Sequence, residues 1–177
     1  MKQRMYFFVP YNISEIQKGI QAGHVALEYA YDYGRTEEFQ SFVKNDKTWI
    51  ILNGGTTCSR NLALENSHDA GTLNQIVSSL VEHYIPHSVF YEPDLNYALT
   101  AVCFLADERV WDREKYVDAR KYIYGIYNDK TFEEQAKDIS DNIFFSLCEK
   151  DYSKWLKEIG GKKNAFLREL IKDKRLA

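Results

Sequence analysis

Hydrophobic and polar positions along the chain alternate between patterns typical of strands and patterns typical of helices. Runs rich in aromatic and β-branched residues, which favour strands, occur at residues 4–10, 48–52, 88–91 and 99–105. Apolar residues three or four apart, the spacing of a helix, occur at residues 12–34, 36–44 and 72–84. The resulting β-α-α-β-α-β-β order predicts an α/β fold, with a mixed four-stranded sheet and helices on its faces.

The first predicted helix carries signals for its start and for its buried side. Asn12 and Glu15 have the spacing of a capping box, and Tyr11 can pack on Ile16 as a hydrophobic staple. Gly34 is a plausible helix stop. We expect the buried stripe to consist of the residues at helical spacing, Ile16, Ile20, Gly23, Leu27 and Ala30.

The next two helices have inward faces of the same kind. In residues 36–44 the inward side chains are expected to be Phe39, Phe42 and Val43. Thr72 and Gln75 have capping-box spacing at the start of the third helix. Its inward side is expected to contain Leu73, Ile76, Val77, Leu80, Val81 and Tyr84. Residues 53–68 carry no clear pattern, and we assign them no element.

Beyond Asp107 the pattern becomes helical, with breaks at glycines. Thr131 and Glu134 have capping-box spacing. The inward stripe that follows is expected to contain Phe132, Ile139, Ile143 and Leu147. We therefore expect an α/β domain over residues 1–107 and a helical C-terminal extension over residues 108–177.

The net charge of −3 over 177 residues hides an asymmetry. From Lys150 onward there are nine Lys or Arg and four Asp or Glu, a net charge of +5, which leaves −8 for residues 1–149. A basic tail on an acidic body can bind a polyanion such as RNA. The alternative is an ordinary solvated helical face.

Composition excludes several classes of protein. The sequence has no apolar run of about 20 residues, so we expect no membrane span, and no signal-peptide pattern precedes the first strand. Three widely spaced cysteines suggest neither a disulfide framework nor a zinc site. His83 and His87 have ligand-like spacing, but Pro86 interrupts any helix that would align them. We expect a cytoplasmic protein with unpaired thiols and no metal.

Two groups of polar residues could carry chemistry. Gln17, Gln21 and His24 recur along one side of the first helix. Glu92 and Asp94 flank Pro93 at the end of a predicted strand, where loops commonly present functional side chains. From spacing alone, the first group is also consistent with a solvated helical face and the second with a rigid acidic turn.

Both groups resemble motifs of the archaeal and eukaryotic type of peptidyl-tRNA hydrolase. In that family a Gln and a His three residues apart follow a Gly-Lys pair on the first helix, and Gln21 and His24 match them within residues 14–26. Residues 90–102 resemble the family's acidic turn and its final, Thr-containing strand. The resemblance covers residues 4–107. It departs from the family at Gln17, where the family has Lys, and at Glu92, where it has Asp.

The resemblance implies hydrolysis of the ester between a peptide and the terminal ribose of tRNA. It assigns Glu92 and His24 to orienting or deprotonating water, and Gln21, Lys18 and Thr100 to donating hydrogen bonds. The side chains expected to contact the substrate are Gln17, Lys18, Asp94, Asn96, Lys162 and Lys163. No cofactor is expected.

The expected partner is tRNA or peptidyl-tRNA, and the sequence leaves a homodimer open. Two alternatives to the hydrolase remain. One is a noncatalytic module that binds RNA or protein on the same fold. The other is a hydrolase or transferase acting on a different small substrate.

Overall fold

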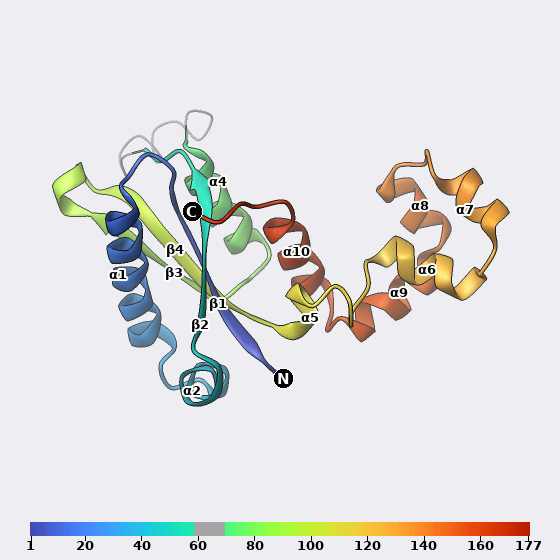
Figure 1. Ribbon diagram of the computed structural model, residues 1–177, viewed down its shortest axis with the longest axis horizontal. Helices are drawn as coiled ribbons and strands as arrows, with labels where there is room; N and C mark the ends of the chain where they lie inside the picture. The colour runs from blue at the N-terminus through green and yellow to red at the C-terminus, as the bar shows by residue number, and fades with distance from the viewer. Residues whose placement is uncertain (59–69) are drawn as a thin grey trace. The chain divides into compact units, whose positions relative to one another are not determined.

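The computed structural model describes residues 1–58 and 70–177, in two compact units (Figure 1). The first unit contains Met1–Glu108 together with Leu170–Ala177, and the second contains Arg109–Glu169. The sequence pattern predicts a division into residues 1–107 and 108–177. The two divisions differ at Glu108 and in the last eight residues, which belong to the sheet unit. Residues 59–69, which include most of the segment without a clear pattern, lie outside the described residues.

The first unit is built around the expected mixed sheet. Its strands are β1 (Gln3–Pro10), β2 (Thr48–Gly55), β3 (His87–Glu92) and β4 (Ala98–Asp107). Its helical segments are α1 (Glu15–Tyr33), α2 (Glu37–Ser41), the π-helical turn η1 (Phe42–Asp46), α4 (Thr72–Glu82) and the 3₁₀ turn η2 (Pro93–Leu95). The strands lie in the order β2-β1-β4-β3, with β1 parallel to β2 and antiparallel to β4, which also pairs antiparallel with β3. This confirms the predicted α/β fold.

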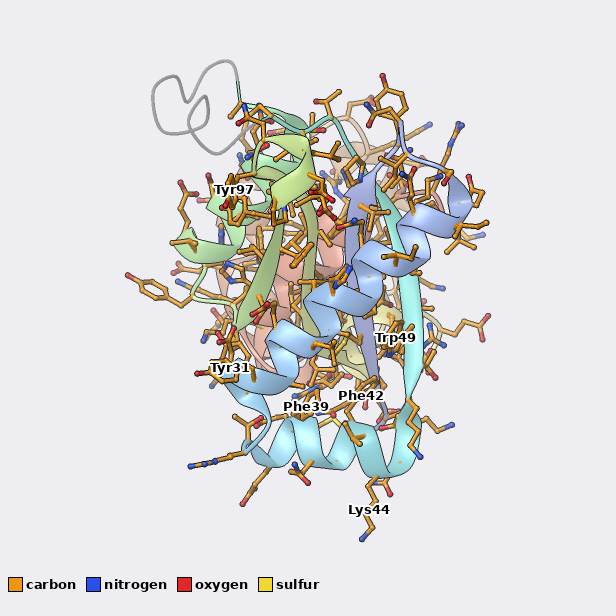
Figure 2. The ribbon with its side chains drawn as sticks, turned by 90° about the vertical axis from the view of Figure 1, so that its left-hand side faces the viewer. Tyr31, Phe39, Phe42, Lys44, Trp49 and Tyr97 are labelled. Atoms are coloured by element: carbon orange, nitrogen blue, oxygen red, sulfur yellow. The ribbon has the colours of Figure 1, made fainter. Side chains whose placement is uncertain are left out.

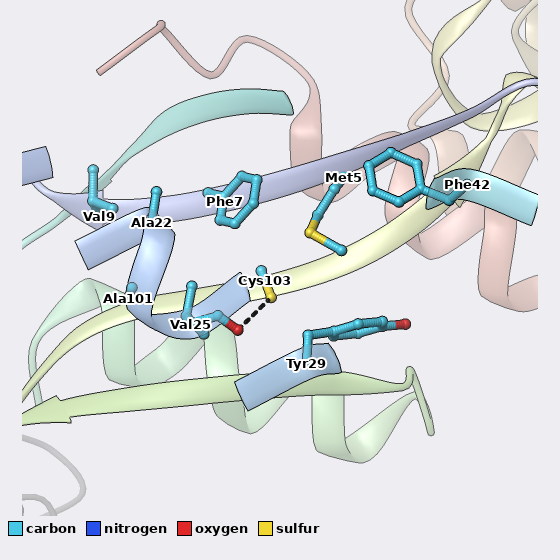
Figure 3. Packing of buried hydrophobic residues seen from close by; sticks show 9 residues of the cluster. All are labelled: Met5, Phe7, Val9, Ala22, Val25, Tyr29, Phe42, Ala101 and Cys103. Atoms are coloured by element: carbon cyan, nitrogen blue, oxygen red, sulfur yellow. Dashed lines mark hydrogen bonds between the residues drawn. The ribbon is translucent and has the colours of Figure 1, made fainter. Parts of the chain in front are cut away.

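Helices cover both faces of the sheet, so the two central strands are buried throughout most of their length. On the α1 face, side chains from β1, α1, η1 and β4 form one core cluster (Figure 3), with buried members Met5, Phe7, Val9, Ala22, Val25, Tyr29, Phe42, Ala101 and Cys103. Because side chains alternate along a strand, Tyr6 and Phe8 point to the α4 face, where both contact Phe104. Burial on both faces explains the unbroken apolar run of β1.

The predicted buried stripe of α1 is wrong. Ile16, Ile20 and Leu27 are 78%, 50% and 71% exposed, and the helix instead packs on the sheet through a side that includes Ala22 and Val25. The buried side of α1 also contains Gln21 and Tyr29. The expected cap is also wrong, because Ser14 forms the capping box with Gln17.

Two other helix starts differ in how far they follow the sequence prediction. Thr36 caps α2, its hydroxyl accepting from the Phe39 amide, and Phe42 is buried as expected, but Val43 is 42% exposed. Thr72 does not cap α4, because its hydroxyl donates to the Gly54 carbonyl at 2.8 Å and accepts from the Thr56 amide at 2.8 Å. This hydroxyl therefore ties the start of α4 to the end of β2.

The last residues of the chain extend the sheet at its β2 edge. The Asn53 amide donates to the Arg175 carbonyl and the Ala177 amide donates to the Ile51 carbonyl, each at 3.0 Å. Leu176 lies opposite Leu52 in an antiparallel bridge. Figure 1 shows this end of the chain, marked C, beside β2. The C-terminal tail thus forms one isolated antiparallel bridge with the edge strand.

The second unit is helical. Apart from α5 (Glu108–Trp111) at the boundary, its helices are α6 (Ala119–Tyr127), α7 (Lys130–Ala136), α8 (Asp141–Leu147), α9 (Glu149–Glu158) and α10 (Lys162–Ile171). Ile143 and Leu147 are exposed, and Phe144 and Cys148 take the inward positions, one residue later than predicted. Asp129, rather than Thr131, caps α7.

A buried arginine holds the second unit together. Arg168 is 1% exposed and donates to the Arg109 carbonyl at 2.6 Å, the Tyr116 carbonyl at 2.7 Å and the Asp118 carboxylate at 2.7 Å. Arg113 also pairs with Asp118, at 2.9 Å. A buried guanidinium requires such partners because its charge is costly to remove from water.

Two further sequence expectations bear on the class of protein. All three cysteines, Cys58, Cys103 and Cys148, are free thiols. In the part of the chain that the structure describes, no helix is long and apolar enough to cross a membrane.

Candidate functional site

A chain of hydrogen bonds joins three of the predicted site residues across the face of the sheet. The Thr100 hydroxyl donates to Gln21 Oε1 at 2.5 Å, and Gln21 Nε2 donates to Glu92 Oε2 at 2.7 Å. The three residues come from β4, α1 and the end of β3, so the fold connects positions as much as 79 residues apart. Thr100 and Gln21 are buried, and Glu92 is half-buried at the open end of the chain of bonds.

The identity of the partners fixes the orientation of the Gln21 amide. A carboxylate can only accept hydrogen bonds, so the NH₂ group of Gln21 must point to Glu92. Its carbonyl oxygen then faces Thr100, which has a hydroxyl to donate. Gln21 therefore links the buried Thr100 hydroxyl to the partly exposed Glu92 carboxylate.

An irregularity in β4 turns Thr100 toward α1. Phe90 pairs with Ala101 and Tyr91 pairs with Leu99, so Thr100 is the extra residue of a β-bulge. Ala101 belongs to the core cluster on the α1 face, and regular alternation would point Thr100 away from that face. The bulge instead aims both residues at α1. Without it, Gln21 would lack its buried partner.

His24 lies one turn further along α1 and is exposed. Its ring stacks on the ring of Phe90, with the centroids 4.6 Å apart and the planes 12° from parallel. Phe90 is two residues before Glu92, and its carbonyl is 3.4 Å from the Thr100 hydroxyl. Stacking on Phe90 thus restrains the imidazole at the border of the hydrogen-bonded group.

The remaining predicted residues of the first unit lie outside this group of contacts. Gln17 is used in the helix cap, where its Oε1 accepts from the Ser14 amide at 3.0 Å. Lys18 pairs with Glu15 at 2.8 Å. Asp94 and Asn96 are exposed in the turn between β3 and β4, where Asn96 has a left-handed backbone with φ of 53°.

One departure from the sequence interpretation concerns the role of Gln21. Spacing predicts Gln21 on an exposed polar stripe with Gln17 and His24, but it is only 7% exposed and both ends of its amide have partners within the chain. Lys162 and Lys163 are exposed at the start of α10, in the second unit. The sequence does not single out Phe90, whose ring stacks on the ring of His24. Its spacing in β3 is that of any strand residue, so no local signal distinguishes it.

The described residues offer no evident metal centre. Within residues 1–58 and 70–177 there is no group of three or more His, Cys, Asp or Glu side chains suited to hold an ion. His83 and His87 each lie close to a backbone carbonyl, Ser79 O at 2.9 Å and Ile85 O at 2.7 Å.

The geometry suits the orientation of a water molecule. The hydrogen bond between the Glu92 side chain and Gln21 uses Oε2. Oε1 can therefore accept from a water, while the exposed His24 ring offers a nitrogen that can donate or accept. A carboxylate and an imidazole near a substrate can share general acid and base work.

Compared with known proteins, the chain matches no family model and no curated protein in sequence.

Proposed function

We propose that this chain is a peptidyl-tRNA hydrolase-like esterase, which cleaves the ester between a peptide and the terminal ribose of tRNA. The observation that carries the proposal is the chain of hydrogen bonds from Thr100 through Gln21 to Glu92, with His24 beside it. The same residues carry the resemblance to the archaeal and eukaryotic enzymes. Their meeting at one place supports a shared site rather than scattered coincidences.

Glu92 is the proposed water-orienting group. Ester hydrolysis needs a nucleophilic water whose proton is accepted as the carbon–oxygen bond forms. With Oε2 held by Gln21, the carboxylate cannot rotate freely, so Oε1 presents a fixed acceptor to that water. The Glu92 side chain is longer than the family's Asp, and the hydrogen bond from the Gln21 amide holds it in place.

His24 is the proposed second group. The tetrahedral intermediate carries an oxyanion, and its collapse releases the ribose oxygen, which must gain a proton. The imidazolium form of the exposed His24, whose ring stacks on Phe90, can donate a hydrogen bond to the oxyanion or a proton to the ribose oxygen. Lys18, tied to Glu15 at 2.8 Å, would have to leave this partner to contact the substrate.

The RNA part of the substrate is proposed to contact the basic C-terminal region. Lys162 and Lys163 are exposed at the first turn of α10. Contacts of lysine with phosphate are independent of sequence and sensitive to salt. Such contacts suit a tRNA, whose phosphates are common to all substrates of the enzyme.

One observation favours the second candidate, a noncatalytic module that binds RNA or protein. Gln21 uses both ends of its amide within the chain, and Gln17, which replaces the family's Lys, caps the helix. Both are therefore occupied in maintaining the fold. A protein that kept the scaffold without the reaction would have the same contacts.

Incubation with tRNA esters distinguishes the two candidates. The chain is incubated with N-acetyl-aminoacyl-tRNA and, separately, with free aminoacyl-tRNA, and release of deacylated tRNA is followed on acid gels. A peptidyl-tRNA hydrolase releases tRNA from the first substrate and spares the second. Binding of tRNA without release from either ester would support the noncatalytic module and contradict the proposed hydrolase.

A further inference from the structure

The turn between β3 and β4 exposes an aromatic ring next to the candidate site. Tyr97 lies between the 3₁₀ turn η2 and the start of β4, and its side chain is 56% exposed. Figure 2 shows Tyr97 in the upper part of the view, in which α1 crosses the front of the sheet. A flat, largely exposed ring of this kind can stack on another flat group.

The register of the hairpin fixes how near Tyr97 lies to Glu92. Glu92 pairs with Ala98, the residue that follows Tyr97. Paired residues of antiparallel strands have Cα atoms about 4.5–5.5 Å apart, and consecutive Cα atoms are about 3.8 Å apart. The Cα atoms of Glu92 and Tyr97 therefore lie within about 9 Å of each other. At this separation one molecule of the size of a nucleoside can contact both side chains.

The backbone of the turn holds Tyr97 in a conformation that tyrosine rarely adopts. Asn96 and Tyr97 both have φ of 53°, in the left-handed region. Asn tolerates this region, and Asn96 ends η2. For a bulky residue such as Tyr the same φ is a genuine outlier, and such outliers cluster at sites that clamp ligands. Glycine adopts this backbone without the cost, so the ring at position 97 indicates a role beyond shaping the turn.

The charge of the turn indicates which part of an RNA it can contact. Residues 92–97 include two carboxylates, Glu92 and Asp94, and no Lys or Arg. Like charges repel, so these carboxylates disfavour a phosphate at the turn. A nucleobase is uncharged, and aromatic side chains commonly stack on the bases of single-stranded RNA. The turn therefore favours contact with a base over contact with the phosphate backbone.

We propose that the ring of Tyr97 stacks on the terminal base of tRNA. This inference rests on the proposed hydrolase function, because the ester that is cleaved is on the terminal ribose and Glu92 orients the attacking water. The base attached to that ribose then lies at the turn, on the Tyr97 ring. Stacking tolerates any base and holds the ester beside the carboxylate.

The test uses the full chain and an RNA hairpin with the sequence of a tRNA acceptor stem, in which 2-aminopurine replaces the terminal base. Stacking on an aromatic ring quenches the fluorescence of 2-aminopurine. We expect the parent chain and Tyr97→Phe, which keeps the ring, to quench it equally. Tyr97→Leu should lose the quenching and bind about tenfold more weakly, the typical effect of losing one stacked base. No quenching by the parent, or equal quenching by Tyr97→Leu, would overturn the proposal.

Tyr84 provides a matched control. It is 81% exposed and also has φ of 53°, but it directly follows the last residue of α4, where left-handed residues are common. Tyr84→Leu should leave quenching and affinity at the parent level. A loss as large as that of Tyr97→Leu would overturn the proposal.

A hairpin that lacks the terminal nucleotide tests the same contact from the side of the RNA. It should bind the parent about tenfold more weakly than the complete hairpin does. Tyr97→Leu should bind the two hairpins equally, because it has no ring to lose contact with the base. An equal penalty in both proteins would overturn the proposal.

Cleavage of N-acetyl-aminoacyl-tRNA separates this inference from the function on which it rests. Tyr97→Leu should lower kcat/KM by about tenfold, since the stacking energy contributes to binding of the substrate. A parental kcat/KM in this variant would overturn the stacking and leave the hydrolase standing. Quenching by the parent without cleavage would support the stacking and contradict the hydrolase.

Discussion

The bond between Thr100 and Gln21 gives a quantitative test of the candidate site. Thr100→Val keeps the shape of the side chain and removes the hydroxyl that donates to Gln21 Oε1 at 2.5 Å. Gln21 is 7% exposed, so its Oε1 atom would remain buried and would lose its hydrogen-bond donor. Leaving a buried acceptor unpaired costs about 1–3 kcal/mol. We expect the sheet unit to lose about this much stability.

A double-mutant cycle separates the hydrogen bond from packing. Gln21→Met removes the other partner, and the double variant replaces both by apolar groups of similar shape, which is often nearly neutral. The cost of the double variant should therefore be smaller than the sum of the two single costs, by about 1 kcal/mol or more. Ser78→Ala, at an exposed hydroxyl of α4 that donates to Asn74 within its own helix, is the control and should change stability by less than about 0.5 kcal/mol.

Hydrogen exchange of the β4 amides, followed by mass spectrometry, is the appropriate assay. The chain has two units, and a single unfolding curve would mix their transitions. Exchange within Ala98–Asp107 reports on the opening of the sheet unit alone. Additive single costs, or a Thr100→Val variant as stable as Ser78→Ala, would refute the role given to this bond.

Three further predictions concern other parts of the chain. Partial burial raises the pKa of Asp118, but the Arg168 hydrogen bond and the Arg113 and Arg168 charges outweigh it and hold the pKa below its ordinary value. The ion pairs of the Asp118 carboxylate therefore stabilise the second unit above about pH 3.9, the pKa of an unfolded Asp. This stabilisation is lost as the pH falls through the lower pKa of the folded state. Asp118→Asn should therefore flatten the acid dependence of hydrogen exchange in the second unit. Burial raises the pKa of the Cys103 and Cys148 thiols. Only the partly exposed Cys58 should therefore react with Ellman's reagent before the protein unfolds. Rapid reaction of all three thiols in the native protein would contradict this. Changing the Lys162–Lys163 pair to Gln should weaken tRNA binding and reduce its salt slope by about 0.9 for each phosphate that the variant no longer neutralises, whereas an unchanged slope would exclude the pair from RNA binding.

The order and type of the elements in the sheet unit could be predicted because their cause is local. A strand buried on both faces must be apolar at every position, and residues 4–10 and 99–105 are largely so. The buried side of α1 could not be predicted in the same way. Ile16, Ile20 and Leu27 follow helical spacing as well as Ala22, Val25 and Tyr29 do, so spacing alone does not distinguish the two sides.

The sequence names Thr100, Gln21 and Glu92 as candidates, but their contacts with one another could not be predicted from it. Nothing local marks Thr100 as the extra residue of a bulge, because the bulge depends on the register between β3 and β4. The burial of Gln21 follows from that register, since the turned hydroxyl satisfies its amide. The pairing of the tail with β2 joins residues more than 120 positions apart, which periodicity cannot detect.

The most direct test of the proposed hydrolase is single-turnover cleavage of N-acetyl-aminoacyl-tRNA by the parent chain and by Glu92→Gln. The control is Glu82→Gln, at an exposed carboxylate of α4. If Glu92 orients and deprotonates the attacking water, Glu92→Gln should slow the chemical step by roughly a hundredfold or more, while tRNA binding and the rate of Glu82→Gln stay at the parent level. Cleavage by Glu92→Gln at the parent rate would contradict the role proposed for this carboxylate.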